Sequence, residues 1–421
     1  MIGPIDYVFI ACLVVIWSVL LYHVVLSYAG YRYSLSAQKE KERLDETPIG
    51  ELPSVTVLVP AHNEEAVIEK TLLALAAMDY PTGKVEIICI NDGSRDRTGK
   101  IARKISESSK GKIRVLDVPK ERSGKGKSEA LNFGLEHASG EIIAVYDADN
   151  TPERSALLYL VRNLVEGKDA LGAVIGKFRT RNQDRNLLTR FINLETIFFQ
   201  WTTQAGRWNL YRLATIPGTN FVVWTELLKS LKGWDPKALT EDTELSIRIY
   251  LAGKFIKMIP YAVTWEEEPE RWPVWFRQRT RWAMGNIYVL KKYFLSLLFR
   301  GKFRLYWDIL YMLLIYFLFL TSVTTSLVIF LLGLTGIGNI VLEGPFNILW
   351  FLAAVLFVTE MGISLTAEPG EDRATNLTIA LVMYFTYSQL WLIVMFNALI
   401  KSFLSLFRKG GHFWVKTERA G

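Results

Sequence analysis

The sequence predicts an α/β domain with a mainly parallel sheet, set between apolar segments that are long enough to cross a membrane. Three observations lead to this fold class. Half of the 421 residues are hydrophobic, which is too many for a disordered chain. Charged residues still make up 22%, which is too many for a chain that lies wholly in lipid. The apolar residues are concentrated in four long blocks, and β-branched runs alternate with helical patterns between the first two blocks.

The first apolar block covers residues 5–28 and can cross a bilayer as a helix, which takes about 20 residues. It is too long for the apolar part of a signal peptide, and no basic residue precedes it. Four basic residues follow it, which favours the cytoplasmic side for that end: Arg32, Lys39, Lys41 and Arg43. We therefore expect residues 1–31 to form a transmembrane helix that starts outside, and residues 32–52 to form a charged linker.

Three further apolar blocks cover residues 305–334, 346–365 and 377–400, so we expect residues 305–421 to hold transmembrane helices and a basic tail. The loop over 335–345 carries no Lys or Arg and is expected outside. Basic residues flank the region on both sides and favour the cytoplasm: Arg300, Lys302, Arg304, Lys401, Arg408, Lys409, Lys416 and Arg419. Four full crossings that start outside must end outside, so either one block lies in the interface or enters the membrane only partway, or the basic tail departs from the charge rule. We expect the first.

Between these blocks, apolar runs alternate with helical patterns. The expected strands cover residues 55–59, 85–90, 113–118 and 142–146, and the expected helices cover 66–78, 98–109, 125–137 and 152–166. This alternation predicts right-handed βαβ units and a mainly parallel sheet. Ligands of such sheets bind at the carboxyl ends of the strands, so the residues just after each strand are the candidates for a site.

Acidic residues stand at these positions. Asp92 follows the second expected strand, and Asp147 and Asp149 follow the fourth. A single aspartate there is usually a turn or cap residue. Two neighbouring carboxylates repel each other unless a cation lies between them, and Mg²⁺ or Mn²⁺ takes oxygen ligands from protein and phosphate together. The pair therefore favours a site for a metal and a diphosphate.

Two other segments allow two interpretations each. Residues 123–128 read Ser-Gly-Lys-Gly-Lys-Ser, but Glu121 stands where a Walker nucleotide loop requires glycine. This segment, with Lys127, is either a basic loop that meets phosphate or a solvated turn. Thr240, Glu241 and Asp242 begin a helix, either as a cap with an acidic first turn or as the source of a general base.

Aromatic and basic residues mix in two segments, 187–203 and 272–282. This composition is typical of amphipathic helices that lie in the membrane interface. We therefore expect both segments to hold the middle domain against the bilayer, with 271–304 forming a separate interfacial region. Such a role leaves Gln278, Arg281 and Trp282 free to face a site.

Four motifs in chain order resemble those of membrane-embedded family-2 glycosyltransferases, which include cellulose, chitin, hyaluronan and poly-N-acetylglucosamine synthases. Asp92, Asp147-Ala148-Asp149, Thr240-Glu241-Asp242 and Gln278-Arg279-Thr280-Arg281-Trp282 are similar to the D, DxD, TED and Q(Q/R)xRW motifs. The run at 60–64 and Gly218-Thr219-Asn220 are also similar to that family. The resemblance covers about residues 53–290 and implies a GT-A fold for 53–270, with the acceptor-end motif in 271–304.

The resemblance also implies roles. The residues implied on the donor nucleotide and its diphosphate are Asp92, Asp147, Glu64 and Lys127. Asp149 is the implied ligand of Mg²⁺ or Mn²⁺. Asp242 is the implied general base, and Thr240 and Glu241 belong to the same catalytic motif. The residues implied at the acceptor end and the pyrophosphate are Gln278, Arg279, Arg281, Trp282, Gly218 and Asn220.

The implied activity is inverting transfer from a nucleotide sugar, UDP-GlcNAc or UDP-glucose, to a β-linked exopolysaccharide that is exported across the cell membrane. The catalytic domain is expected in the cytoplasm, in contact with membrane lipids and with a growing glycan or lipid acceptor. Regulation is expected from a partner subunit. The alternatives are a transferase that adds one sugar to a membrane lipid, and a transporter or scaffold with a degenerate nucleotide-binding domain. No nucleic-acid partner is expected despite the net charge of +7. The basic residues cluster beside the apolar blocks, where the preference of basic residues for the cytoplasmic side already accounts for them.

Overall fold

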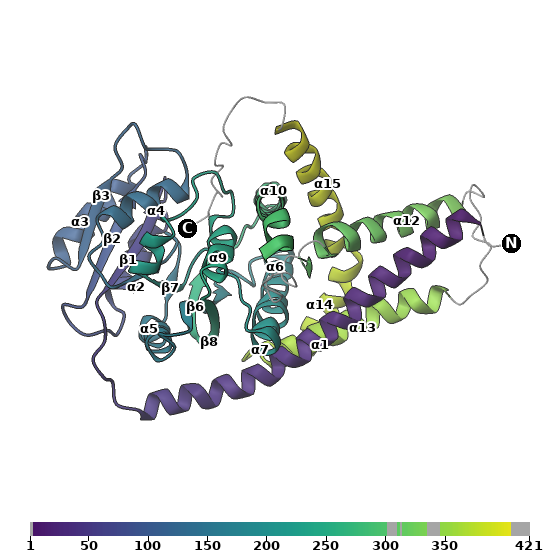
Figure 1. Cartoon of the computed structure of the whole chain (residues 1–421), viewed down its shortest axis with the longest axis horizontal. Coiled ribbons are helices and arrows are strands. Elements are labelled where there is room, and N and C mark those ends of the chain that lie inside the picture. Colours follow the sequence, from purple (N-terminus) through teal and green to yellow (C-terminus); the bar gives the residue numbers. More distant parts are fainter. Residues whose placement is uncertain (1–2, 301–309, 312–313, 335–345, 406–421) are drawn as a thin grey trace.

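A computed structural model describes residues 3–300, 310–311, 314–334 and 346–405 (Figure 1). Its strands in these ranges form one eight-stranded sheet with the order β3-β2-β1-β4-β7-β6-β8-β5. The strands are β1 (Val55–Ala61), β2 (Val85–Asn91), β3 (Ile113–Asp117), β4 (Ile142–Val145), β5 (Thr151–Pro152), β6 (Leu171–Thr180), β7 (Phe221–Trp224) and β8 (Phe255–Glu266).

The four strands expected from the sequence all form, and they pair in parallel. β1 lies between β2 and β4, with Val55 opposite both Val85 and Ile142. β3 continues the parallel half beside β2. β7 runs antiparallel between β4 and β6, and β6 pairs in parallel with β8. The mainly parallel sheet is confirmed, and its shared register brings the carboxyl ends of β1, β2 and β4 to one edge.

Helices connect the strands of this domain. They are α2 (Ile68–Ala76), α3 (Thr98–Ser108), α4 (Lys127–Glu136), α5 (Ala156–Glu166), α8 (Thr225–Ser230) and α9 (Glu241–Leu251). The four expected helices correspond to α2–α5. The helix expected from residue 152 begins only at Ala156, because Thr151 and Pro152 pair with β8 as strand β5.

The first helix, α1 (Pro4–Glu46), is longer than the sequence predicts. It continues through most of the segment expected to be a charged linker. Its last turns pack on α5: the Arg43 guanidinium lies 2.7 Å from the Glu166 carboxylate, and the Tyr159 hydroxyl donates to Asp45 at 2.6 Å. Leu44 is fully buried. These contacts stabilise helix where composition alone indicated a linker, so one continuous helix runs from the apolar region to the sheet domain.

The two segments with mixed aromatic and basic residues are helical, as predicted. The first covers α6 (Leu187–Phe198) and part of the π-helix η1 (Phe199–Gly206), which α7 (Arg207–Tyr211) follows, and the second begins α10 (Trp272–Arg300). Backbone-to-backbone contact joins η1 to α1. A Cβ on Gly30 would lie 1.9 Å from the Trp201 carbonyl oxygen, and one on Gly206 would lie 2.3 Å from that of Leu26. Small residues allow such close helix packing.

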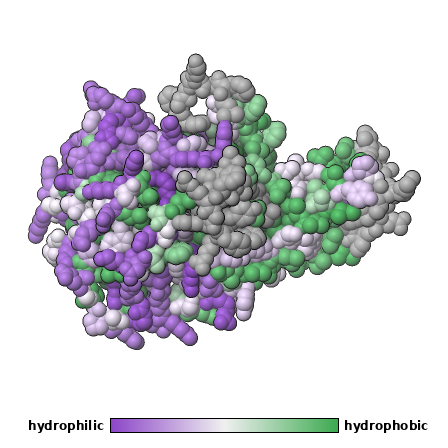
Figure 2. All heavy atoms as spheres, viewed as in Figure 1, coloured by the Kyte–Doolittle hydropathy of each residue, from purple (hydrophilic) through white to green (hydrophobic). Residues whose placement is uncertain are grey.

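The remaining helices are η2 (Leu314–Phe319), α12 (Leu320–Leu334), α13 (Phe346–Thr366), α14 (Ala374–Phe385) and α15 (Tyr387–Ser405). Among the described residues, three helical stretches are long and apolar enough to cross a membrane, namely Pro4–Glu46, Ile348–Thr366 and Ala374–Ser405. Part of the expected block at 305–334 lies outside the described residues. Figure 2 shows apolar residues over the arm that α1, α12 and α13 form, and polar residues over the sheet domain.

Candidate active site

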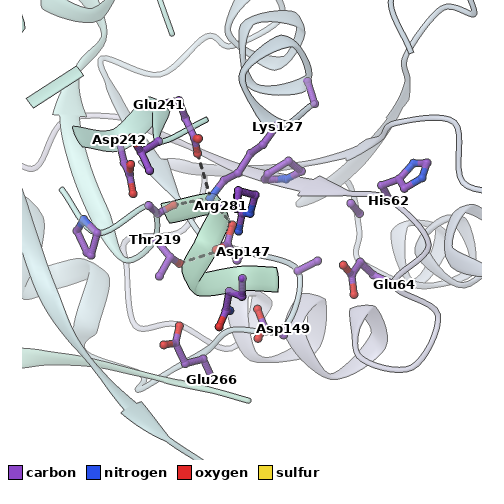
Figure 3. A pocket seen from close by; sticks show the side chains of 18 of the residues that line it. His62, Glu64, Lys127, Asp147, Asp149, Thr219, Glu241, Asp242, Glu266 and Arg281 are labelled. Carbon is purple, nitrogen blue, oxygen red and sulfur yellow. Dashed lines mark hydrogen bonds and ion pairs between the residues drawn. The ribbon is translucent and has the colours of Figure 1, made fainter. Parts of the chain in front are cut away.

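A pocket opens at the carboxyl edge of the parallel strands (Figure 3). Its walls come from the ends of β1, β2, β4 and β8, from the start of α4 and α9, and from one face of α10. Twelve residues predicted from the sequence line it: Glu64, Asp92, Lys127, Asp147, Asp149, Gly218, Thr240, Glu241, Asp242, Gln278, Arg281 and Trp282. Residues as far apart in the chain as Glu64 and Trp282 therefore meet at one cavity.

The loop before α4 faces this pocket. The Gly124 N–H donates to the Asp92 carboxylate at 2.8 Å. Gly93 has a φ of +63°, and a Cβ there would lie 2.1 Å from the Ser123 hydroxyl, so the two loops touch. Only glycine allows both this backbone conformation and this approach. From the sequence, residues 123–128 are either a basic loop near phosphate or a solvated turn. The contact of Gly124 with Asp92 and the position of Lys127 place this segment beside the pocket.

Lys127 contacts residues from three other segments of the pocket. Its ammonium group lies 2.6 Å from an Asp147 oxygen and 3.5 Å from a Glu241 oxygen, and it donates to the Gly218 carbonyl at 2.8 Å (Figure 3). Burial lowers the pKa of Lys127, but the charges of Asp147 and Glu241 outweigh that effect, so its pKa is raised. Lys127 therefore stays charged and places a half-buried cation beside the strand-end carboxylates.

Asp242 lies in the first turn of α9, next to Glu241. Burial and the Glu241 charge raise the pKa of Asp242 to about 7, against the opposing charges of Lys127 and Arg281. One Asp242 oxygen accepts the Thr243 N–H at 2.7 Å. A Cβ on Gly218 would lie 2.9 Å from the other oxygen, and the Gly218 φ is +90°. A carboxyl group that titrates near neutral pH has the property of a general base.

Thr240 precedes this carboxylate and contacts α10. A Cβ on Gly285 would lie 2.5 Å from the Thr240 methyl group, so α9 and α10 approach closely here. Thr240 shows no side-chain cap hydrogen bond to α9. The Thr240 side chain therefore packs between α9 and α10 and fixes the distance between these helices beside Asp242.

A second carboxylate cluster surrounds Asp149. Asp149 is almost fully buried, and its side chain accepts the Glu267 N–H at 3.4 Å. Glu266 and Glu268 also line the pocket. Burial raises the pKa of Glu266, and the charges of Glu268 and Asp147 raise it further. Burial likewise raises the pKa of Glu268. The electrostatic cost of this cluster would fall if a cation or a proton were shared within it.

Several pocket residues received no role from the sequence. They are His62, Thr219, Glu266, Glu267 and Glu268. His62 accompanies Glu64 in the run at 60–64, and its ring contacts the Asp92 carbonyl oxygen at 2.5 Å. The acidic run that ends β8 is visible in the sequence, but the pairing of β8 with β5, in which Thr151 lies opposite Trp265, brings it beside Asp149.

Two predicted site residues lie outside the residues that line the pocket. Arg279 is 1% exposed and points away, because successive residues of a helix lie about 100° apart and Gln278 occupies the pocket face. Asn220 is also buried and donates to the carbonyls of Lys177 at 3.0 Å and Ala262 at 2.8 Å. A register shift between β6 and β8 falls at Ile175–Lys177, and Asn220 satisfies the backbone there. Its side-chain amide therefore contacts the sheet backbone and lies outside the pocket lining.

Arg279 instead joins the pocket to α15. Its guanidinium lies 2.6 Å from Glu195 of α6 and 4.2 Å from the centre of the Trp282 ring, and it donates to the Gln278 side chain at 2.7 Å. Glu195 also accepts from Tyr387 at 2.8 Å and Trp391 at 2.7 Å. Glu195 and Arg279 therefore fix two pocket residues, Gln278 and Trp282, against the apolar helices.

Comparisons with known proteins agree with this geometry. Residues 53–285 match the family model described as "Glycosyltransferase like family 2". The chain is 45% identical over 414 residues to the "Probable glycosyltransferase YdaM" of Bacillus subtilis (strain 168), with 98% of each chain covered. It is 33% identical over 279 residues to "Poly-beta-1,6-N-acetyl-D-glucosamine synthase" of Staphylococcus aureus (strain COL), covering 65% of this chain and 63% of that protein.

A solved structure shows the same fold. It is the mannosyltransferase PcManGT from Pyrobaculum calidifontis, in complex with GDP-Man and Mn²⁺, with a TM-score of 0.55 and 21% identity over 87% of this chain and 99% of that one. Together with the sheet order, it confirms the expected GT-A fold. The family match over most of the sheet domain and the identity along nearly the whole chain set aside the transporter or scaffold alternative: the protein is a glycosyltransferase and belongs to family 2.

Proposed function

We propose that the enzyme transfers a sugar from UDP-N-acetylglucosamine or UDP-glucose to a hydroxyl group of a growing β-linked glycan, and that this glycan leaves across the membrane. One observation carries the proposal: a single pocket brings together the carboxylates at the strand ends, a carboxyl group with a pKa of about 7, and an aromatic residue, Trp282, on α10. The relation to poly-beta-1,6-N-acetyl-D-glucosamine synthase supports the class of donor and product.

The donor end is the side with Asp92 and Lys127. Asp92, already oriented by the Gly124 N–H, would accept hydrogen bonds from the nucleoside. Lys127 and Arg281 both line the pocket and would face the diphosphate, where negative charge grows as the sugar leaves. Donors placed in advance against developing charge usually supply the largest share of catalysis.

A divalent cation fits this end of the pocket. Among the described residues, no group of three His, Cys, Asp or Glu side chains is arranged to hold a metal ion. Mg²⁺ and Mn²⁺ sites that act on nucleotides commonly take one or two carboxylates, with phosphate oxygens as further ligands. Asp149 and Asp147 match that donor set, and the raised pKa of Glu266 shows excess negative charge there. The metal would neutralise charge on the leaving diphosphate.

Asp242 would activate the acceptor. A sugar hydroxyl is a weak nucleophile, and a carboxylate within hydrogen-bond reach can take its proton as the new bond forms. Attack from the face opposite the leaving diphosphate inverts an α-linked donor to a β-linked product. Trp282 and Gln278 share the pocket face of α10 and would hold the acceptor sugar, since aromatic rings suit the apolar faces of sugars.

One observation favours the alternative in which a single sugar is added to a membrane lipid. An apolar groove lies between α10 and α15, lined by Trp272, Pro273, Trp275, Phe276, Leu390 and Ile393. Four of its lining residues belong to α10, the helix that carries Gln278 and Trp282. A lipid chain in this groove could therefore reach the acceptor end. The two functions share the donor site and differ in the product.

The size of the product tests the proposal. Purified enzyme in vesicles is incubated with radiolabelled UDP-N-acetylglucosamine or UDP-glucose, and the products are separated by gel electrophoresis and by extraction into organic solvent. We expect a ladder of water-soluble chains that digestion by a β-specific glycosidase shortens. A single labelled species that enters the organic phase would establish the lipid acceptor and overturn the polymerase proposal.

The Glu195→Gln substitution tests how the acceptor end is positioned. It removes the charge that holds buried Arg279, so Gln278 and Trp282 should lose their fixed positions. Misplacing groups at a reacting centre by about 1 Å can cost about 100-fold in rate, so we expect transfer to fall by about 10- to 100-fold. UDP binding should not change, because Asp92 and Lys127 do not contact Glu195. Titration calorimetry and transfer kinetics measure the two effects.

Glu226→Gln, an exposed change on α8, is the matched control. Glu195→Asp keeps the charge and should recover part of the rate. Equal loss of UDP binding and transfer would instead show that Glu195 only maintains the fold, and a normal rate would contradict its positioning role.

A further inference from the structure

We infer that α14 and α15 lie along the cytoplasmic boundary of the membrane, with one apolar face in the lipid, and do not cross it. The inference rests on the proposed cytoplasmic location of the catalytic domain. Length and composition alone favour a crossing for Ala374–Ser405. The contacts at both ends of this stretch argue against one.

The beginning of the stretch is bound to the catalytic sheet. Glu368, just before α14, lies 2.7 Å from the Lys177 ammonium and 3.0 Å from the Arg179 guanidinium, and both of these residues belong to β6. Arg190 of α6 lies 3.1 Å from Glu371 and donates to Asn376 at 2.6 Å. Glu368 and Lys177 are both at least 95% buried. The first turn of α14 is therefore held against the catalytic domain.

The second helix of the stretch, α15, also contacts the same domain. Tyr387 and Trp391 both donate to Glu195 of α6. Two turns further on, Asn397 donates to the Thr280 hydroxyl of α10 at 3.1 Å. Thr280 stands between the pocket residues Gln278 and Arg281, so this part of α15 lies beside the active site.

These two sets of contacts conflict with a crossing. A helix rises about 1.5 Å per residue, so the stretch from Asn376 to Asn397 could extend for about 30 Å, the thickness of the hydrocarbon core. A crossing helix would place Asn397 on the side opposite Asn376. Both residues contact the catalytic domain. In Figure 1, α15 runs across the direction of α1, α12 and α13, as expected for a helix that does not cross beside them.

The outer face of these helices is apolar and requires a partner. Its large exposed side chains are Leu377, Leu381, Val382, Phe385, Ile393, Phe396, Leu399, Ile400 and Leu404. A continuous apolar face of this kind is unfavourable in water. Lipid is the partner that the position favours, because α14 packs against α13, which is long and apolar enough to cross the membrane. We assign this face to the acyl chains of the cytoplasmic leaflet.

The arrangement also removes the conflict in the charge pattern. If α14 and α15 do not cross and the block at 305–334 does, the chain that starts outside makes three crossings before α14. Lys401 then lies on the cytoplasmic side, as its charge favours, where anionic lipids attract it. The third C-terminal block is thus the one that lies in the interface.

Single-cysteine labelling tests this topology. Cys12 and Cys89 are first replaced by alanine in the full chain. The reporters, one per variant, are Arg95→Cys in the catalytic domain, Gly338→Cys between the second and third blocks, Asp372→Cys before α14 and Gly421→Cys at the C-terminus. In intact cells, we expect a membrane-impermeant maleimide to label only the cysteine at 338. The other three should be labelled after the membrane is permeabilised.

The labelling pattern distinguishes a wrong topology for α14 and α15 from a wrong location for the catalytic domain. Labelling of position 421 in intact cells, with 95 and 372 protected, would show that α14 and α15 cross the membrane and would overturn the inference. Labelling of position 95 in intact cells would overturn the cytoplasmic location in the proposed function, and the inference with it.

A disulfide test addresses the contact itself. Thr280→Cys combined with Asn397→Cys, in the same cysteine-free chain, should cross-link when membranes are treated with copper phenanthroline. Thr280→Cys with Phe396→Cys is the control, because Phe396 is 67% exposed on the outer face, and it should not cross-link. No cross-link in the first pair would contradict the position of α15 on α10.

Discussion

Replacing Asp242 by asparagine is expected to reduce sugar transfer by about 10²- to 10⁴-fold, the usual contribution of a positioned general base. The amide has nearly the same shape but cannot take the acceptor proton. UDP binding should be unchanged, because Asp92 and Lys127 remain. Transfer kinetics and calorimetric titration with UDP measure the two properties.

The variant should fold normally, for an electrostatic reason. The folded-state pKa of Asp242, about 7, lies above that of an unfolded aspartate. Ionising Asp242 above about pH 4 therefore favours the unfolded state, and asparagine removes that cost. Asp169→Asn, at an exposed position outside the pocket lining, is the control and should keep full activity. An active Asp242→Asn enzyme would remove the base assignment.

The same pKa predicts the pH dependence. The base acts as the carboxylate, so kcat/KM should fall tenfold per pH unit below about 7 and level off above it. The residual activity of the Asp242→Asn enzyme should lack this acidic limb. A profile that is flat from pH 5 to 8 in the unmodified enzyme would contradict a base with this pKa.

Removal of divalent metal is expected to have the second large effect. Chelation should lower transfer by about 100-fold or more, since the charge on the leaving diphosphate would lose its strongest partner. Addition of Mg²⁺ or Mn²⁺ should restore the rate. Asp149→Asn should lower the apparent affinity for the metal, measured as the concentration that gives half of the maximal rate.

Asp169→Asn serves again as the control and should respond to metal as the unmodified enzyme does. Undiminished activity in the chelated enzyme would overturn the metal proposal. If Asp149→Asn left the metal dependence unchanged, Asp149 would not be a ligand, and the carboxylates of the β8 end, Glu266 to Glu268, would become the candidates.

The sequence predicted the parallel half of the sheet because its strands are short, apolar and regularly followed by helices. It also predicted Asp92, Asp147 and Asp149, since residues that follow parallel strands meet at one edge. Asp242 and Lys127 could be recognised as candidates, but each allowed a structural interpretation. The motifs also placed Arg279 and Asn220 at the site, but both lie outside the pocket lining, because motif membership does not show which face of a helix or turn a side chain occupies.

Local order along the chain therefore determined the fold class, the family resemblance and most residues of the pocket, since these depend on periodicity and on spacing over a few residues. Tertiary structure alone decided the rest. The pKa of Asp242, the pairing of Arg279 with Glu195 and the place of Glu266 depend on burial and on charges brought together from distant segments. The course of α14 and α15 was decided in the same way: their composition suits a crossing, and only ionic and polar contacts with β6, α6 and α10 hold both ends on one side.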